Sequence, residues 1–235
     1  MNLQIRQREP ELMDQPGLSD AEHGSALTGL SRVNWFSRSS SIFWGPLSKL
    51  AQTIDQRPVK ILDIASGGGD VSIDLAMRAR QTGLDIEISG CDISEYAVKH
   101  ATERAQQKGL EKIHFFQSDI FQEPAERKYD LVMCSLFLHH LDEPQAVQLM
   151  QWMSESTRHL LLINDLRRTR LGYWLAWCGC RLLTRSPIVH TDGPVSVAAA
   201  FSIDETEQLA RQAGLNQIQV SRHWPQRFLL EWSRV

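Results

Sequence analysis

The sequence predicts an α/β protein built on a doubly wound, mostly parallel sheet of seven strands. Two observations support this prediction. Short apolar segments typical of buried strands alternate along the chain with segments of helical apolar spacing, a pattern typical of a parallel sheet with helices on both faces. The chain has 235 residues, enough for one such domain with a sizeable core. Proteins of this class bind ligands at the carboxyl ends of their strands.

Residues 1–55 are expected to form an arm and a helical lid. Residues 1–18 are polar and carry two prolines, so they read as a loose arm. Ser19 and Glu22 form a capping-box pattern, in which the serine caps a helix and the glutamate reaches back to its amide. A helix should therefore follow, and a second one is expected over 41–53.

Residues 56–235 are expected to form the main domain as one folding unit. Five strands are expected in its first part, over 59–64, 86–91, 113–117, 129–135 and 159–165, with two more in the tail after residue 216. Helices are expected over about 69–79, 94–107 and 145–156, and after a second capping box at Ser202 and Glu205. The segment 167–200 reads as a helical insert after the fifth strand that caps the sheet.

Composition and charge argue against several classes of function. The formal net charge is −3 and no long block of lysine or arginine is present, so nucleic acid is not an expected partner. The first residues lack an apolar signal core, and the apolar run 171–180 is too short to cross a bilayer, so we expect a cytoplasmic protein. The four cysteines show no framework spacing. No cluster of histidine, cysteine and acidic residues is visible, so we expect a site without metal.

The strongest functional signal is the segment 63–70, where a strand runs into a loop of small residues that opens a helix. Glycines let the backbone approach a bulky ligand, and helix amides favour a negatively charged group. Asp92 ends the next strand, where an acid can accept both hydroxyls of a ribose. A dinucleotide-dependent dehydrogenase shares this geometry, but Gly67, Gly69 and Ser72 only approximate its fingerprint. Too little chain follows for a separate substrate domain, which disfavours the dehydrogenase.

The sequence of residues 62–69, Leu-Asp-Ile-Ala-Ser-Gly-Gly-Gly, resembles the first motif of class I S-adenosylmethionine (AdoMet)-dependent methyltransferases, written L-D-[LIV]-G-x-G-x-G. The match covers roughly residues 55–220, and it implies a Rossmann-like fold with AdoMet as cofactor. The cofactor contacts that it implies are Asp63, Ala65, Ser66, Gly67 and Gly69 for the methionine part, Asp92 for the ribose, Ile93, Asp119 and Ile120 around the adenine, and Ser135 beside the methionine. Ala65 departs from the motif, because glycine is usual there. Its methyl group should be tolerated only at negative φ.

The segment Leu138-His139-His140-Leu141 is similar to the H-H-L that follows the fourth strand in small-molecule methyltransferases, those of ubiquinone and menaquinone among them. The order of the predicted strands, helices and insert also resembles that of methyltransferases associated with bacterial type III polyketide synthases. This second resemblance implies a phenolic or pyrone-like acceptor with an alkyl chain.

Three residues are candidates for proton transfer to or from the acceptor. A histidine can take the proton of a hydroxyl, because its unperturbed pKa of about 6.5 lies near working pH. His139 is favoured over His140, and at most one of them should face the acceptor. The alternative is that both only shape the loop. Asp165, which ends the fifth strand, orients a histidine or the substrate, or else caps the helix after it.

The middle of the insert, 171–177, is apolar around most of a helix, whereas Arg170, Arg181 and Arg185 share one stripe. Three interpretations remain open: the helix roofs an apolar pocket, lies at a membrane surface, or pairs with its copy in a homodimer. The sequence therefore predicts O-methylation of a small hydrophobic acceptor, phenolic or polyketide-derived. The alternatives are C-methylation of a quinone-like or lipid acceptor and a catalytically silent AdoMet-fold binding protein.

Overall fold

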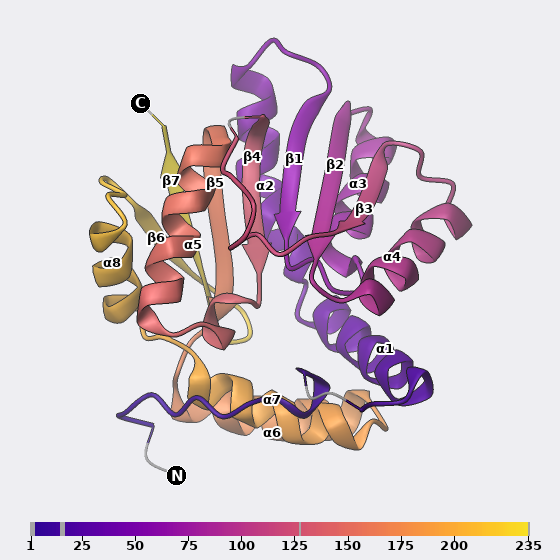
Figure 1. The fold of residues 1–235 in the computed structure, drawn as a ribbon, viewed down its shortest axis with the longest axis vertical. Helices are drawn as coiled ribbons and strands as arrows, with labels where there is room; N and C mark the ends of the chain where they lie inside the picture. The colour runs from indigo at the N-terminus through magenta and orange to yellow at the C-terminus, as the bar shows by residue number, and fades with distance from the viewer. Residues whose placement is uncertain (1–2, 15–16, 127, 235) are drawn as a thin grey trace.

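The computed structural model describes residues 3–14, 17–126 and 128–234, and it confirms the predicted doubly wound sheet of seven strands. The strands lie in the order β3-β2-β1-β4-β5-β7-β6, and all neighbours are parallel except β7, which is antiparallel to β5 and β6 (Figure 1). Their bounds are β1 Val59–Ile64, β2 Ile86–Asp92, β3 Ile113–Gln117, β4 Tyr129–Ser135, β5 Thr157–Leu166, β6 Gln219–His223 and β7 Arg227–Ser233.

The helices that follow the two predicted capping boxes begin where those boxes place them. Ser19 and Ser202 cap α1 and α8 in complete capping boxes, and Asp142 forms a third box at α5. The helices are α1 Asp20–Phe36, α2 Ser39–Thr53, α3 Asp70–Thr82, α4 Glu95–Gln107, α5 Glu143–Ser156, α6 Arg170–Leu183, α7 Pro187–Ala199 and α8 Ile203–Gln212. Two short 3-10 turns, η1 Leu12–Asp14 and η2 Leu138–His140, complete the elements that concern the site.

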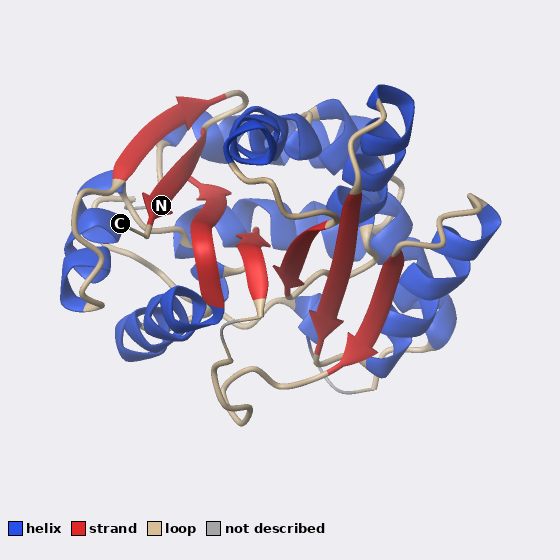
Figure 2. Ribbon diagram, turned by 90° about the horizontal axis from the view of Figure 1, so that it is seen from above, coloured by secondary structure: helices blue, strands red, loops and turns tan. Residues whose placement is uncertain are grey.

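Helices cover both faces of the sheet, as the alternating sequence pattern requires (Figure 2). On one face α2 and α3 pack against the strands in a cluster that includes Phe43, Leu75 and Leu162. On the other face α5 and α8 pack in a cluster that includes Met150 and Leu209. Burial on both sides explains why the central strands are almost wholly apolar.

The carboxyl edge of the sheet is where the site must lie. The chain leaves β1 toward β2 on one side, whereas β4 lies on its other side, so the winding direction reverses between β1 and β4. Such a reversal opens a crevice at the carboxyl ends of the strands. Helices α6 and α7 lie across this edge, with α1 beside them and the N-terminal arm running over them (Figure 1).

The N-terminal arm is ordered, which corrects the expectation of a loose segment over residues 1–18; of these, 1–2 and 15–16 lie outside the described residues. The backbone N–H of Gln7 donates to the carbonyl of Ala198 at 3.0 Å. The amides of Leu12 and Met13 donate to the two carboxylate oxygens of Asp192 at 2.9 and 3.1 Å. The arm's partners are about 180 residues away, so no local pattern reveals them. Within the described parts of the chain, no helix is long and apolar enough to cross a membrane.

Candidate active site

One cavity of about 1020 Å³ lies at the carboxyl edge, and most of its lining is apolar. It reaches from the glycine-rich loop after β1 to the inner sides of α1, α6 and α7. Of the predicted site residues, it is lined by Asp63, Ala65, Ser66, Gly67, Asp92, Ile93, Asp119, Ile120, Ser135, His139 and His140. Gly69 and Asp165 are absent from this wall and lie behind it.

The loop between β1 and α3 has a backbone conformation that lets a ligand approach it closely. Gly67 has φ of +52°, and a Cβ built on it would meet no atom within 4 Å, so it faces open space in the cavity. Gly69 has φ of +73°, and a Cβ there would lie 2.7 Å from the ring of Phe115, which leaves room only for glycine. Ala65 has φ of +52°, which corrects the expectation of a negative φ. The left-handed conformation costs alanine roughly 1–2 kcal/mol, which the rest of the fold must offset.

Asp63 is buried at the end of β1 and faces the same cavity. Its carboxylate accepts a hydrogen bond from the Ser72 hydroxyl at 2.6 Å. Burial raises the pKa of Asp63 to about 7, although this hydrogen bond opposes the shift and the charge of Asp92 adds to it. A cationic group in the cavity would stabilise the ionised carboxylate.

Asp92, at the end of β2, holds the loop as well as facing the cavity. Its Oδ2 accepts from the Gly67 N–H at 2.8 Å, and its Oδ1 accepts from the Ser94 N–H at 2.9 Å. Ile93 follows it and is largely exposed at the cavity wall. Each carboxylate oxygen can accept a further hydrogen bond, so a diol could still bind here.

The remaining predicted cofactor residues lie on the third and fourth strand ends. Asp119 caps its own turn, because its oxygens accept from the Phe121 N–H at 3.0 Å and the Gln122 side chain at 2.8 Å. Ile120 is buried in the core, so only part of it reaches the cavity. Ser135 accepts from the Asn164 side chain at 2.9 Å.

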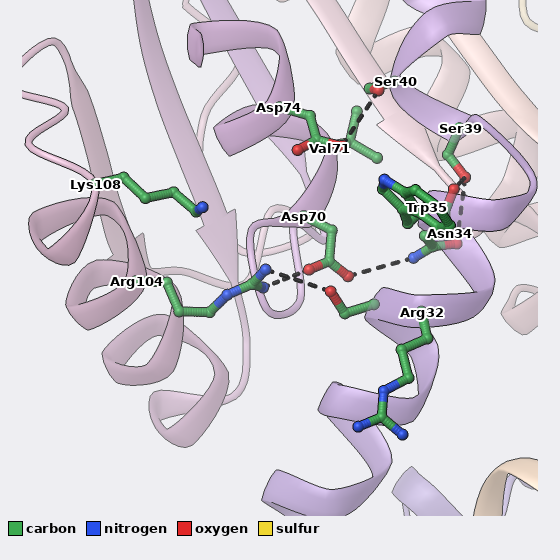
Figure 3. A pocket seen from close by; sticks show the side chains of 11 residues that line it. Arg32, Asn34, Trp35, Ser39, Ser40, Asp70, Val71, Asp74, Arg104 and Lys108 are labelled. Carbon is green, nitrogen blue, oxygen red and sulfur yellow. Dashed lines mark hydrogen bonds and ion pairs between the residues drawn. The ribbon is translucent and has the colours of Figure 1, made fainter. Parts of the chain in front are cut away.

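A second, small polar hollow lies between α1, α3 and α4, behind the loop (Figure 3). Asp70, the first residue of α3, lies there between Arg104 and Asn34. Arg104 forms an ion pair with Asp70 and also donates to the carbonyl of Gly68 at 2.7 Å. These contacts connect the loop to α4 and α1. Arg104 and Asp70 therefore stabilise the position of the loop.

His139 is buried at the cavity wall in the turn η2, directly after β4. Asp165, at the end of the neighbouring β5, lies 2.7 Å from its Nδ1 and also accepts from its backbone N–H at 3.0 Å. The sequence placed these two residues on adjacent strand ends, and the structure brings them into contact. Asp165 therefore orients His139 and does not itself face the cavity.

Glu11, from the N-terminal arm, completes this polar cluster, and the sequence pattern did not reveal it. Its Oε1 lies 3.5 Å from Nε2 of His139 and 3.9 Å from Nε2 of His140. Burial alone would lower the pKa of His139, but the Asp165 and Glu11 carboxylates raise it to about 10. Burial would raise the pKa of Glu11, but the hydrogen bond and charge of His139 lower it to about 2. The two carboxylates thus hold the pKa of His139 above that of a free histidine.

The arm is fixed to the cluster by its own contacts. Arg6 donates to the carbonyls of His139 and Leu141 at 2.8 and 2.6 Å, so it clamps the turn η2. The Ser196 hydroxyl of α7 donates to Oε1 of Glu11. Glu11 is thus positioned by α7 and by the turn η2, and both are remote from it in the sequence.

The far end of the cavity is an apolar lobe under the insert, with inner walls from α6, α7 and α1. The residues that line it include Leu27, Leu30, Trp174, Leu175, Ala176, Gly179, Leu183 and Val197. A Cβ built on Gly179 would meet no atom within 4 Å. Arg227, which the sequence did not indicate, lines the opposite side, where burial lowers its pKa to about 10. Its guanidinium donates to Ser39 at 2.6 Å, while its Nε has no hydrogen-bond partner among the described residues.

Comparison with known sequences finds one family for the central part of the chain. Residues 55–167 match the model of a methyltransferase domain family. The ubiquinone biosynthesis O-methyltransferase of Rickettsia conorii is 26% identical over 121 residues, which are 52% of this chain and 39% of that protein. The release factor glutamine methyltransferase of Fusobacterium nucleatum is 35% identical over 74 residues, which are 31% of this chain and 20% of that protein. The chain thus spans less than half the length of these curated relatives.

Solved structures share the fold. The magnesium protoporphyrin IX methyltransferase of Synechocystis, solved with bound S-adenosylhomocysteine (SAH), superposes with a TM-score of 0.59 at 18% identity, covering 95% of this chain and 91% of that one. An AdoMet-dependent methyltransferase of Aquifex aeolicus superposes with a TM-score of 0.57 at 17% identity, covering 81% and 89%. At these identities the likeness concerns the fold alone.

Proposed function

The chain belongs to the class I AdoMet-dependent methyltransferases, with AdoMet as its cofactor, and we propose that it methylates a hydroxyl group of a small hydrophobic molecule, phenolic or polyketide-derived. One observation carries this proposal: a single cavity of about 1020 Å³ is lined by the glycine-rich loop, by the His139 cluster and by apolar residues of α1, α6 and α7. The polar end suits the cofactor and the apolar end suits the acceptor.

The cofactor end offers a partner for each part of AdoMet. The loop at Gly67 leaves open space beside its backbone, where the methionine part can lie. The AdoMet ammonium would meet Asp63, whose burial makes a cationic partner favourable. The ribose hydroxyls would bind Asp92, and the adenine would lie against Ile93 and near Asp119.

The His139 cluster is where we place the acceptor oxygen. Methyl transfer asks the protein mainly to align the acceptor oxygen, the methyl carbon and the sulfur, and positioning alone can supply several kcal/mol. His139 holds a proton between two carboxylates, so its imidazolium would stabilise the negative charge of a deprotonated acceptor oxygen. Asp165 fixes the ring, and His140, the nearest other imidazole in the cavity, would take the hydroxyl proton.

The apolar lobe would select for an acceptor with an alkyl chain. Each methylene that it buries contributes about 0.8 kcal/mol. A protein or peptide acceptor fits less well, because the residues of α1, α6 and α7 that line the lobe are mainly apolar.

The proposal is tested by measuring methyl transfer from labelled AdoMet to a phenol with a long alkyl chain and to the same phenol without it. We expect transfer to both and a higher kcat/KM for the first. Gly179→Leu should fill the lobe and raise KM for the long-chain phenol without changing AdoMet affinity. Gly45→Leu is the matched control, because Gly45 also faces open space but lies outside the cavity on α2.

Three outcomes would contradict the proposal. Binding of NAD(H) in place of AdoMet in calorimetry would refute the cofactor. Equal kcat/KM for the two phenols would refute the role of the lobe. Transfer to a protein substrate and to neither phenol would refute the acceptor class.

A further inference from the structure

Three side chains from two remote segments converge at the acceptor end of the cavity. Glu11 comes from the N-terminal arm, and His139 and His140 come from the turn η2, about 128 residues later in the chain. One carboxylate oxygen and one nitrogen from each imidazole all lie within 4.8 Å of one another. All three residues line the cavity.

The distances between these atoms are somewhat longer than those between ligands that share an ion. Two atoms bound at about 2.0–2.1 Å in a tetrahedral site lie roughly 3.3 Å from each other. Oε1 of Glu11 lies 3.5 Å from Nε2 of His139 and 3.9 Å from Nε2 of His140. Both separations are longer than a good N–H···O hydrogen bond, and small rotations would bring them to the ligand spacing.

Two of the three side chains are also oriented by partners behind them, as metal ligands usually are. Nδ1 of His139 lies 2.7 Å from Asp165, which leaves Nε2 directed at the cluster. Glu11 accepts from the Ser196 hydroxyl, and the arm is anchored next to it by the Asp192 carboxylate. A carboxylate–histidine pair of this kind raises the basicity of the imidazole as a ligand.

Two carboxylates next to the histidines suit a cation. Asp165 and Glu11 bring two carboxylates beside one buried histidine, and the nearest other charges on Asp165 are those of Arg6 and Arg227. A divalent ion bound to neutral imidazoles would balance both carboxylates. Buried charges are stable only when they are paired or coordinate metals.

We propose that Glu11, His139 and His140 bind a divalent cation of the zinc class, with one coordination position open toward the cavity. Two imidazoles and one carboxylate form a ligand set that suits zinc and its first-row neighbours, whereas magnesium and calcium prefer oxygen ligands only. Three protein ligands with an open fourth position are typical of catalytic rather than structural zinc sites.

The ion would take the place of the His139 proton and of the His140 base in the transfer reaction, a consequence that rests on the proposed function. A hydroxyl that coordinates the ion loses its proton to water more readily, because the ion lowers the hydroxyl's pKa. Its oxygen then attacks the methyl carbon of AdoMet. The C–S bond breaks with its electron pair on sulfur, so a methyl ether and SAH form without a change of oxidation state.

The test is direct metal binding, using the full chain purified with a histidine-free tag and stripped with a chelator. Zinc is titrated in competition with a chromophoric chelator, and cobalt(II) serves as the spectroscopic probe. We expect one zinc per wild-type chain and visible cobalt bands of a four- or five-coordinate site. Asp165→Asn should weaken zinc binding about 10–100-fold, and Glu11→Gln and His140→Gln should weaken it more.

His114→Gln is the control, because His114 is exposed on β3 and remote from the cluster; it should leave zinc affinity unchanged. Circular dichroism and AdoMet binding report folding in every variant. His140 is the more exposed of the two histidines, so at least its variant should fold. No zinc bound by the wild type at micromolar concentration, or equal affinity in wild type and both ligand variants, overturns the site. Zinc binding lost in both variants, with no methyl transfer in any protein, upholds the site and refutes the proposed function instead.

Discussion

The two ends of the cavity differ in how the chain builds them. The cofactor end comes from the successive ends of the first four strands: the loop 65–69, for example, closes on Asp92, the end of the neighbouring strand, through one hydrogen bond of 2.8 Å. The acceptor end is assembled from the arm, η2, α6 and α7, which are far apart in the chain. The first region is fixed by local backbone geometry and the second by tertiary contacts.

This difference has a functional consequence. A site made from one loop tolerates little change, since its conformation depends on particular glycines. A site made from peripheral elements can change its lining without disturbing the sheet. We therefore expect substitutions at the cofactor end to alter AdoMet binding, and substitutions at the acceptor end to alter turnover or acceptor choice while leaving AdoMet binding intact.

The largest effect is expected from Gly67→Val. The side chain would occupy cavity space that the ligand needs and would force a β-branched residue into the left-handed region, so AdoMet binding should be abolished in calorimetry. Gly109→Val is the matched control, because Gly109 has φ of +61° and open space but lies outside the cavity. This control variant should lose stability through backbone strain but keep its AdoMet affinity. Loss of AdoMet binding in both variants, or in neither, would contradict the assignment of the loop at Gly67 to the cofactor site.

At the acceptor end, His139→Gln should lower kcat by roughly 10²–10³-fold, the usual loss when one stabilising donor is removed. AdoMet affinity should stay within a factor of about two, because the ring contacts Asp165 and Glu11 and no residue of the loop. Asp165→Asn should have a smaller effect in the same direction. Single-turnover kinetics together with calorimetry separate the two quantities, and a loss of AdoMet affinity equal to the loss of kcat would contradict the separation of the ends.

Asp92→Ala should weaken AdoMet binding by about 1–3 kcal/mol, the cost of losing hydrogen bonds to a charged group. Because Asp92 also accepts from the Gly67 N–H, the loss has two sources. Comparing SAH with its 2′-deoxy analogue separates them. The analogue should bind more weakly to the wild type and equally well to the variant. An equal penalty in both proteins would remove Asp92 from the ribose.

The smallest effect is a pH dependence of AdoMet binding. The pKa of Asp63 is raised to about 7 in the free protein, so below pH 7 this residue is mostly protonated. A bound ammonium favours the carboxylate, so binding should release up to one proton near pH 6. Affinity should then rise by up to about tenfold per pH unit and level off above pH 7. Calorimetry in buffers of different ionisation enthalpy measures the proton count. Asp63→Asn should abolish the proton release, and an unchanged release in this variant would assign it to another group.

Much of the fold and the cofactor end could be predicted because local signals specify them. The capping boxes at Ser19 and Ser202 begin helices where expected. Strands β1, β3 and β4 match their predicted bounds because they are apolar runs closed by polar or turn residues. Ala65 is an exception, since the neighbouring glycines and the hydrogen bond from the Ser66 N–H to Cys91 impose the turn on it.

The acceptor end could be predicted only in part. Adjacent strand ends suggested that Asp165 could orient a histidine, but nothing local points to Glu11. Its position depends on Asp192 and Ser196 of α7, and those contacts exist only in the folded chain. The raised pKa of His139 could likewise not be predicted from the sequence, because it depends on two carboxylates from different segments. The expectation of a site without metal rested on spacing alone, and spacing does not reveal that Glu11 converges with His139 and His140.

The account is tested most directly by locating the transferred methyl group. AdoMet labelled with carbon-13 in its methyl group is incubated with the protein and an alkylphenol, and the product is identified by mass spectrometry and carbon NMR. We predict a methyl group bound to the phenolic oxygen, formed by the wild type and by Gly45→Leu, and much reduced with His139→Gln. A methyl group bound to a ring carbon, or an unlabelled phenol despite saturating AdoMet, would contradict O-methylation at the His139 cluster.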